Sequence, residues 1–128
     1  MSSEYPVRPQ WFGNAKCAAA FRARMVGFNG APWVQADLSA IAYKVFDADH
    51  GGALVISGSL VVSSVIYNTP QTDDAWPYAD GFNFSAILAG TCFPAGGRLY
   101  LVEFLFTTAA GQQCAEQFEF FGRDILGL

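Results

Sequence analysis

The sequence predicts an all-β fold, an antiparallel β-sandwich of about seven strands, and three observations favour it. Short segments of alternating apolar and polar residues are separated by Gly, Pro and Asn turn signals at intervals of about eight to twelve residues. No segment has a helical period of convincing length. The apolar fraction is 52%, with 12 Phe in 128 residues, which is enough to build one dense core.

The clearest strand patterns lie in the C-terminal part of the chain. Residues 82–88, 98–107 and 113–121 are expected to form three consecutive strands, separated by the turns at 93–97 and 109–111. Strand side chains alternate between the two faces, and both faces of residues 98–107 are apolar. We therefore expect a central strand that is covered on both faces.

Two further strands are expected before them. Residues 15–28 alternate between small or apolar residues and Lys or Arg, which is typical of a strand with one buried face. The strand at residues 40–47 points Ile41, Tyr43 and Val45 inward. On its outward side, Phe46 breaks the polar pattern and is a candidate contact residue. Residues 53–57 and 60–67 follow as one broken strand or two short ones, with Gly58 at a bulge or bend.

The connection at residues 47–52 has two interpretations. Its alternating Asp residues are compatible with a calcium loop, but Gly51 and Gly58 stand where an EF-hand needs an oxygen ligand and a Glu. Asp and Gly also suit a tight turn. We predict a turn and no metal site.

The loop at residues 68–81 is acidic and contains Trp76 and Tyr78. The two rings either bind a sugar by stacking or fasten the loop to the body of the domain. The second interpretation is the simpler one. A carbohydrate-binding module that uses Trp76 and Tyr78 is therefore the alternative function.

The sequence divides into an extended N-terminal arm at residues 1–14, a β-sandwich at residues 15–122 and a C-terminal tail at residues 123–128. The arm is held either by a neighbouring copy or by its own domain, and the tail either closes the sandwich or reaches a neighbour. The interaction candidates in these two segments are Tyr5, Trp11, Phe12, Ile125, Leu126 and Leu128.

Composition and motifs exclude several functional classes. The net charge of −4 disfavours nucleic acid as a partner. Three cysteines without metal-ligand spacing, and no signal-like N-terminus, indicate reduced thiols in a cytoplasm, and no apolar run is long enough to cross a membrane. No nucleophile, phosphate-binding or zinc motif occurs, so we expect no enzyme, no catalytic residue and no cofactor. Glu103 is expected to pair with Arg98 or to lie at an interface.

Tyr100 stands near the start of a strand, two residues before the aliphatic Val102, and this resembles the tyrosine corner of immunoglobulin-like domains. Residues 21–47 and 81–104 also resemble small immunoglobulin-like proteins of tailed bacteriophages and prophages, akin to the N-terminal domain of baseplate upper proteins. The resemblance covers roughly residues 20–122. It implies a non-enzymatic virion component that is made in the host bacterial cytoplasm.

On this resemblance, the predicted function is that of a structural virion protein. It would bind capsid, head–tail or baseplate components, with capsid decoration or an accessory role favoured. Its partners would be other virion proteins and copies of itself, in a homo-oligomer or lattice. The expected contact surfaces are the arm, the tail and the exposed aromatic residues, because extended segments and sheet edges accept another chain as an added strand.

Overall fold

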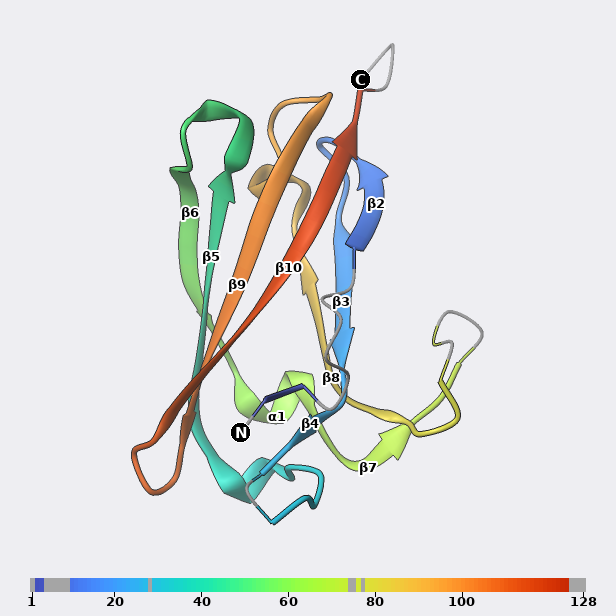
Figure 1. Cartoon of the computed structure of the whole chain (residues 1–128), viewed down its shortest axis with the longest axis vertical. Helices are drawn as coiled ribbons and strands as arrows, with labels where there is room; N and C mark the ends of the chain where they lie inside the picture. Colours follow the sequence, from blue (N-terminus) through green and yellow to red (C-terminus); the bar gives the residue numbers. More distant parts are fainter. Residues whose placement is uncertain (1, 4–9, 28, 74–75, 77, 125–128) are drawn as a thin grey trace.

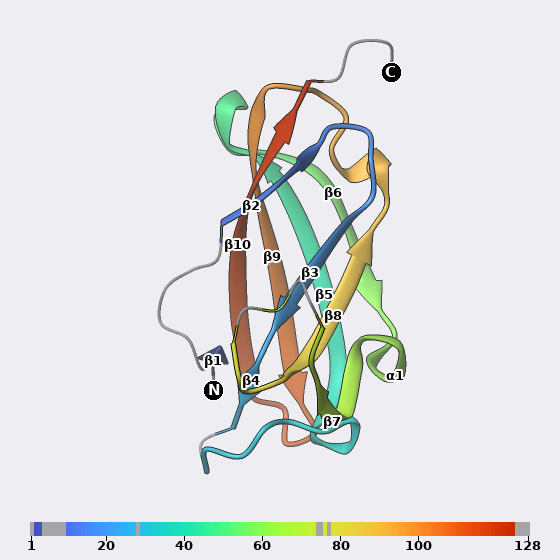
Figure 2. The same ribbon diagram turned by 90° about the vertical axis from the view of Figure 1, so that its right-hand side faces the viewer.

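The computed structural model describes residues 2–3, 10–27, 29–73, 76 and 78–124, most of which lie in β-strands. Two sheets face one another (Figures 1 and 2). One has five strands in the order β2-β10-β9-β5-β6, and the other has three in the order β3-β8-β7. A short pair, β1-β4, makes a third sheet. The prediction of an all-β, mostly antiparallel sandwich is confirmed.

The five-stranded sheet contains the longest strands. Strands β9 and β10 form a hairpin whose register runs from Thr107 opposite Gln113 to Arg98 opposite Gly122. The predicted strands at 98–107 and 113–121 are therefore confirmed, one and two residues longer than expected. The bounds are Gln10–Asn14 (β2), Leu38–Asp47 (β5), Ala53–Leu60 (β6), Arg98–Thr108 (β9) and Gln113–Arg123 (β10).

Part of the predicted arm belongs to the sandwich itself. Strand β2 pairs in parallel with the end of β10, with Gln10 opposite Glu119, and β1 (Ser2–Ser3) pairs with β4 (Met25–Val26). The sequence left open whether a neighbouring copy or its own domain holds the arm. At these positions the arm pairs with its own domain. Tyr5 lies outside the described residues.

The three-stranded sheet consists of β3 (Ala19–Ala23), β7 (Ile66–Gln71) and β8 (Phe82–Leu88). The prediction for β8 is confirmed at both ends. The strand expected at residues 15–28 is shorter than predicted and is interrupted at Arg24. The buried side chain of Asn83 binds the backbone of Met25 beside this break, which replaces strand pairing there.

The prediction for residues 53–67 is wrong in two places. Gly58 is not a bulge, because the irregularity in the β5–β6 pair lies between Val45 and Phe46. Gly58 instead lies opposite Tyr43, and a Cβ atom at Gly58 would meet the Tyr43 hydroxyl at 2.7 Å. Residues 62–65 form a single helical turn, α1 (Val62–Val65), and not a strand.

The turn α1 has a physical reason. It carries the chain from the five-stranded sheet to the three-stranded sheet, and this crossover buries Val65 and Ile66. The β-branched residues favour a strand locally, but burial of these two side chains determines the outcome.

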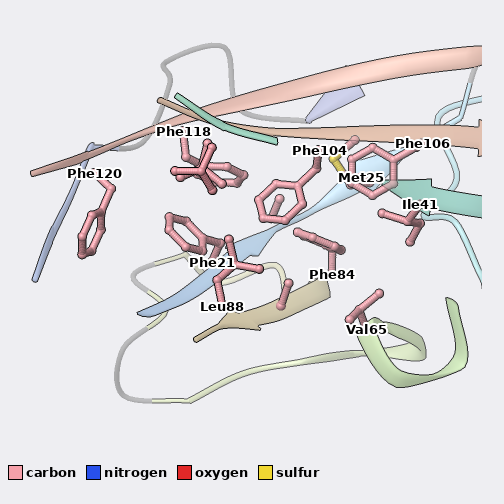
Figure 3. Packing of buried hydrophobic residues seen from close by; sticks show 14 of the residues in the cluster. Phe21, Met25, Ile41, Val65, Phe84, Leu88, Phe104, Phe106, Phe118 and Phe120 are labelled. Atoms are coloured by element: carbon pink, nitrogen blue, oxygen red, sulfur yellow. The ribbon is translucent and has the colours of Figure 1, made fainter. Parts of the chain in front are cut away.

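Aromatic rings fill the space between the two main sheets (Figure 3). Phe21 on β3 is fully buried, and its ring centroid lies 5.8 Å from that of Phe104, 5.5 Å from Phe118 and 5.9 Å from Phe120. The rings meet in tilted or edge-on geometry, which the quadrupole of the ring favours. Several Phe residues are therefore used in the core.

Tyr100 fixes the crossover from β8 to β9. Its hydroxyl donates a hydrogen bond to the Ala95 carbonyl oxygen at 2.7 Å and accepts one from the Ala95 N–H at 2.9 Å. Nearby, a Cβ atom at Gly90 would collide with the Lys16 backbone, so only glycine allows this close approach. The crossover is thus held against the start of β9 and against the loop before β3.

Candidate protein-binding surface

The outer face of the five-stranded sheet carries a row of apolar side chains. Phe46 on β5 lies directly opposite Leu54 on β6 and Leu101 on β9. We call these three residues the outer apolar row. Leu54 is 54% exposed, and Phe46 and Leu101 are half-buried. Beyond the row, Leu99 lies opposite Phe121.

The prediction that strand 98–107 is covered on both faces is wrong. On the outward side Leu105 is 38% exposed, and Lys44, which lies opposite Glu103 on the same face, is exposed. The three-stranded sheet covers only the inner face, so the apolar residues of β9 serve two purposes. Those on the inner face build the core, and those on the outer face remain accessible at the surface.

A polar pair lies beside the outer apolar row. Lys44 lies opposite Glu103, whose other cross-strand neighbour is Gln117. The expected pairing of Glu103 with Arg98 is wrong, because the two residues are five positions apart along one strand, roughly 17 Å at about 3.3 Å per residue. Arg98 instead forms an ion pair with Asp47 at 2.7 Å.

Strand β6, which carries Leu54 of the outer apolar row, forms one edge of the five-stranded sheet (Figure 1). The sequence contains no Asp, Glu, Lys or Arg between Asp49 and Asp73. Val61, which follows β6, is 66% exposed. Edge strands usually carry charges or Pro that prevent pairing with another chain, and β6 has neither. The outer apolar row therefore ends, at Leu54, on an edge strand that carries no charged side chain.

The turn at residues 47–52 uses its carboxylates internally. Asp47 accepts hydrogen bonds from Arg98 Nη1 at 2.7 Å and from the Asp49 N–H at 3.1 Å, and Asp49 accepts one from the Leu99 N–H at 2.8 Å. Burial raises the pKa of Asp47, but the hydrogen bond and charge of Arg98, with smaller contributions from His50 and the Asp49 N–H, outweigh it and lower the pKa. The turn fastens β5 to the start of β9.

The loop before β8 places Trp76 and Tyr78 together, away from the outer apolar row. Trp76 is 8% exposed, and its indole N–H donates to the Asp80 carbonyl oxygen at 2.6 Å. Its ring centroid lies 5.1 Å from that of Tyr78 and 5.6 Å from that of Phe82. Tyr78 is 43% exposed. Trp76 therefore has the contacts expected of a residue that fastens the loop, and Tyr78 is the more accessible ring.

Charged residues reinforce the same loop. Arg22 on β3 forms an ion pair with Asp73 at 3.0 Å, and its guanidinium lies 5.1 Å from the centroid of the Phe82 ring. Arg24 donates to the Gly81 carbonyl oxygen at 3.0 Å. These contacts join Asp73 and Gly81, near the two ends of the loop, to Arg22 on β3 and to Arg24 just after β3.

The side chains of several predicted contact residues lie outside the described part of the chain. The backbones of Trp11 and Phe12 lie in β2, opposite Phe120 and Phe121, but their side chains are outside what the structure describes. Ile125, Leu126 and Leu128 also lie outside the described residues. Phe46 is the predicted contact residue that the structure places on the outer face.

Leu54 and Leu101 are the members of the row that the sequence did not single out. The alternation in residues 98–107 placed Leu101 on the second apolar face, but that face was expected to be covered. For Leu54, the sequence signal that could have indicated a contact surface is the absence of charged residues between Asp49 and Asp73.

Comparison of the chain with protein-family models, with curated proteins and with solved structures gave no match. Among the described residues, no group of three or more His, Cys, Asp or Glu side chains is placed to hold a metal ion. No helix in the described part of the chain is long and apolar enough to cross a membrane. The geometry itself therefore carries the functional argument.

Proposed function

We propose that this chain is an immunoglobulin-like structural protein that acts by binding other proteins, and that its setting is the virion of a tailed bacteriophage. The observation that carries the proposal is the outer apolar row of Leu54, Phe46 and Leu101, next to the uncharged edge of β6. Apolar surface of this kind, when it is contiguous, marks a contact site.

The strand order supports the immunoglobulin-like part of the proposal. In immunoglobulin domains strands B, E and D share one sheet, while G, F, C and C′ share the other. Here β3, β8 and β7 take the places of B, E and D, and β10, β9, β5 and β6 take those of G, F, C and C′.

Two side-chain contacts agree with this assignment. Tyr100 at the start of β9 binds the backbone of Ala95, as the tyrosine of a tyrosine corner does. Val102, two residues after Tyr100, stands where antibody domains have the strand F cysteine of the disulfide between strands B and F. Two residues further along β9, Phe104 packs against Phe21 on β3 with ring centroids 5.8 Å apart and joins the two sheets. Aromatic packing would replace the covalent link, which suits a protein that folds with reduced thiols.

The virion setting is supported by the resemblance of residues 21–47 and 81–104 to small phage proteins. Within that setting, capsid decoration or an accessory role in the particle remains the favoured assignment. The partners would be other virion proteins and further copies of the chain.

Quantitative mass spectrometry of purified particles tests this proposal. Particles of the phage or prophage that carries the gene should contain the chain at a fixed number of copies per particle after a stringent density-gradient purification. A chain that is expressed but absent from such particles would overturn the virion assignment.

The alternative, a carbohydrate-binding module, has less support because the Trp76 ring is buried between Tyr78 and Phe82. Such a module would depend on Tyr78. Screening a glycan panel by tryptophan fluorescence, with Tyr78→Ala as the comparison, separates the two functions. A response in the wild type that Tyr78→Ala abolishes would favour the alternative.

A further inference from the structure

We propose that β6 pairs with β6 of a second copy of this chain, antiparallel and about a two-fold axis near Gly58. The two five-stranded sheets would join into one continuous sheet across the dimer. The inference rests on the proposed function in one respect, because it names a second copy of the chain as one protein partner for the uncharged edge of β6.

The residue pattern of β6 and its flanks favours a second copy as the partner. Read in either direction from Gly58, the segment has the same order of residue classes: Ser, then three aliphatic residues. An antiparallel pair centred on Gly58 would place like beside like within the strand: Ser57 with Ser59 and Ile56 with Leu60. Past the end of β6, Val55 and Leu54 would come level with Val61 and with Val62 at the start of α1. An edge that reads the same in both directions is self-complementary, which an isologous two-fold interface requires.

The faces of the strand agree with this register. Ser57 lies opposite Lys44 and Ser59 opposite Ala42, on the outer face, while Ile56 lies opposite Val45 and Leu60 opposite Ile41, on the core side. Over Ile56–Leu60, each pair across the dimer axis would therefore join residues of the same face. The regular β5–β6 register over Ile56–Leu60 leaves this stretch straight enough to accept another strand.

Electrostatics favours the same partner. The whole chain carries a net charge of −4, so two copies carry like net charge and repel one another at long range. Strand β6 carries no charge, and the nearest charged residue on the outer face is Lys44. In the paired sheet, Lys44 and Ser57 of one copy would lie in line with Ser59 and Ala42 of the second copy. No like charges would be placed opposite one another.

The exposed aliphatic residues at the ends of β6 would be covered in the dimer. Leu54 is 54% exposed and Val61 is 66% exposed. A groove of about 490 Å³ beside the end of β6 is lined by Leu60, Val61 and Val62, among others. The two-fold axis brings Leu54 of the second copy level with Val62, at this groove. The two-fold axis would thus cover both Leu54 and Val61 and place the Leu54 side chain of the second copy at the groove.

Paired charge variants of the full chain test the proposal. Ser57→Lys/Ser59→Lys would place Lys opposite Lys twice in the dimer, and Ser57→Glu/Ser59→Glu would place Glu opposite Glu twice. Both residues are exposed, so the fold should tolerate these changes, which circular dichroism verifies. Gln113→Lys/Ala115→Lys on β10 is the matched control, since it adds the same two charges at the same spacing on another strand of the same sheet.

Sedimentation equilibrium should show a wild-type dimer and an unchanged dimer for the control. Each β6 variant alone should dissociate about tenfold more readily or more, because like charges opposite one another destabilise a strand pair. An equimolar mixture of the Lys and Glu variants should restore the dimer, since each Lys then meets a Glu.

A wild-type chain that stays monomeric at high concentration would overturn the proposal, as would a dimer that both β6 variants leave intact. Failure of the mixture to associate would overturn the antiparallel register centred on Gly58. A monomeric chain that is nevertheless found in purified particles would overturn this inference alone and leave the proposed function standing.

Discussion

Asn83 offers a sharp test of how the two ends of the broken first strand are held. Its side chain is fully buried and accepts a hydrogen bond from the Met25 N–H at 2.8 Å. It also donates to the carbonyl oxygens of Met25 and Trp33, both at 2.9 Å. Asn83→Leu keeps the branch at Cγ but cannot form hydrogen bonds. The Met25 N–H and the Trp33 carbonyl oxygen would lose their Asn83 partner, while the Met25 carbonyl oxygen would keep its bond from the Trp33 N–H at 3.0 Å.

The magnitude follows from the two backbone groups that lose their partner. Each buried backbone group left without a partner costs about 1–3 kcal/mol, and burial of the Leu side chain returns about 1–2 kcal/mol. Asn83→Leu should therefore lower the free energy of unfolding by about 1–4 kcal/mol. That is a large part of the roughly 5–15 kcal/mol that a domain of this size has.

Urea unfolding followed by tryptophan fluorescence and circular dichroism measures this loss as a lower midpoint at an unchanged m-value. Asn68→Leu is the matched control, because Asn68 accepts one exposed hydrogen bond, from the Gln35 N–H at 2.7 Å. The control should change stability by less than about 1 kcal/mol. Equal effects of the two variants would refute the argument that the Asn83 contacts hold this part of the fold.

Three other substitutions test the contacts described above. Tyr100→Phe removes both hydrogen bonds to Ala95 and should cost about 1–3 kcal/mol in urea unfolding. Trp76→Ala should cost about 2–4 kcal/mol and make the loop at residues 72–81 more sensitive to protease, because the ring is buried. Asp47→Asn should be less stable than the wild type near pH 7, and this difference should shrink as the pH falls below the ordinary Asp pKa of 3.8. The sign follows because Arg98 lowers the pKa of Asp47 in the folded state, so the stabilisation is present above 3.8 and is lost as the pH falls through the lowered pKa.

Each of these predictions has a result that contradicts it. A Tyr100→Phe variant as stable as the wild type would show that the corner does not stabilise the crossover. An unchanged protease pattern in Trp76→Ala would count against the fastening role of the ring. A stability difference for Asp47→Asn that stays constant from pH 7 to pH 2 would exclude the ion pair as its cause.

The strand pattern in the C-terminal part of the chain was sufficient to predict its structure. Residues 82–88 and 98–107 are rich in apolar and aromatic residues and end at Gly-containing turns, so local pattern and tertiary structure agree. The segment at residues 60–67 was predicted wrongly, since its β-branched residues fit a strand locally. The need to cross between sheets and bury Val65 is a long-range effect that no local pattern contains.

The surface was harder to predict than the core. Alternation assigned Leu101 and Leu105 to one face of their strand, but it cannot say whether another element covers that face. Asn83 was missed for a related reason, because a polar residue inside an apolar strand gives no indication of its distant partners Met25 and Trp33. Phe46 was identified because an apolar residue on a polar face is a local signal.

The most direct test of the account is the incorporation of Phe46→Asp into particles, measured as copies of the chain per purified particle. Ile87→Asp is the matched control, since Ile87 is 72% exposed on β8 in the other sheet, and circular dichroism confirms that both variants are folded. The account predicts that Phe46→Asp is lost from particles, whereas Ile87→Asp is retained at the wild-type level. Retention of a folded Phe46→Asp chain at the wild-type level would contradict the central claim that the outer apolar row binds the particle.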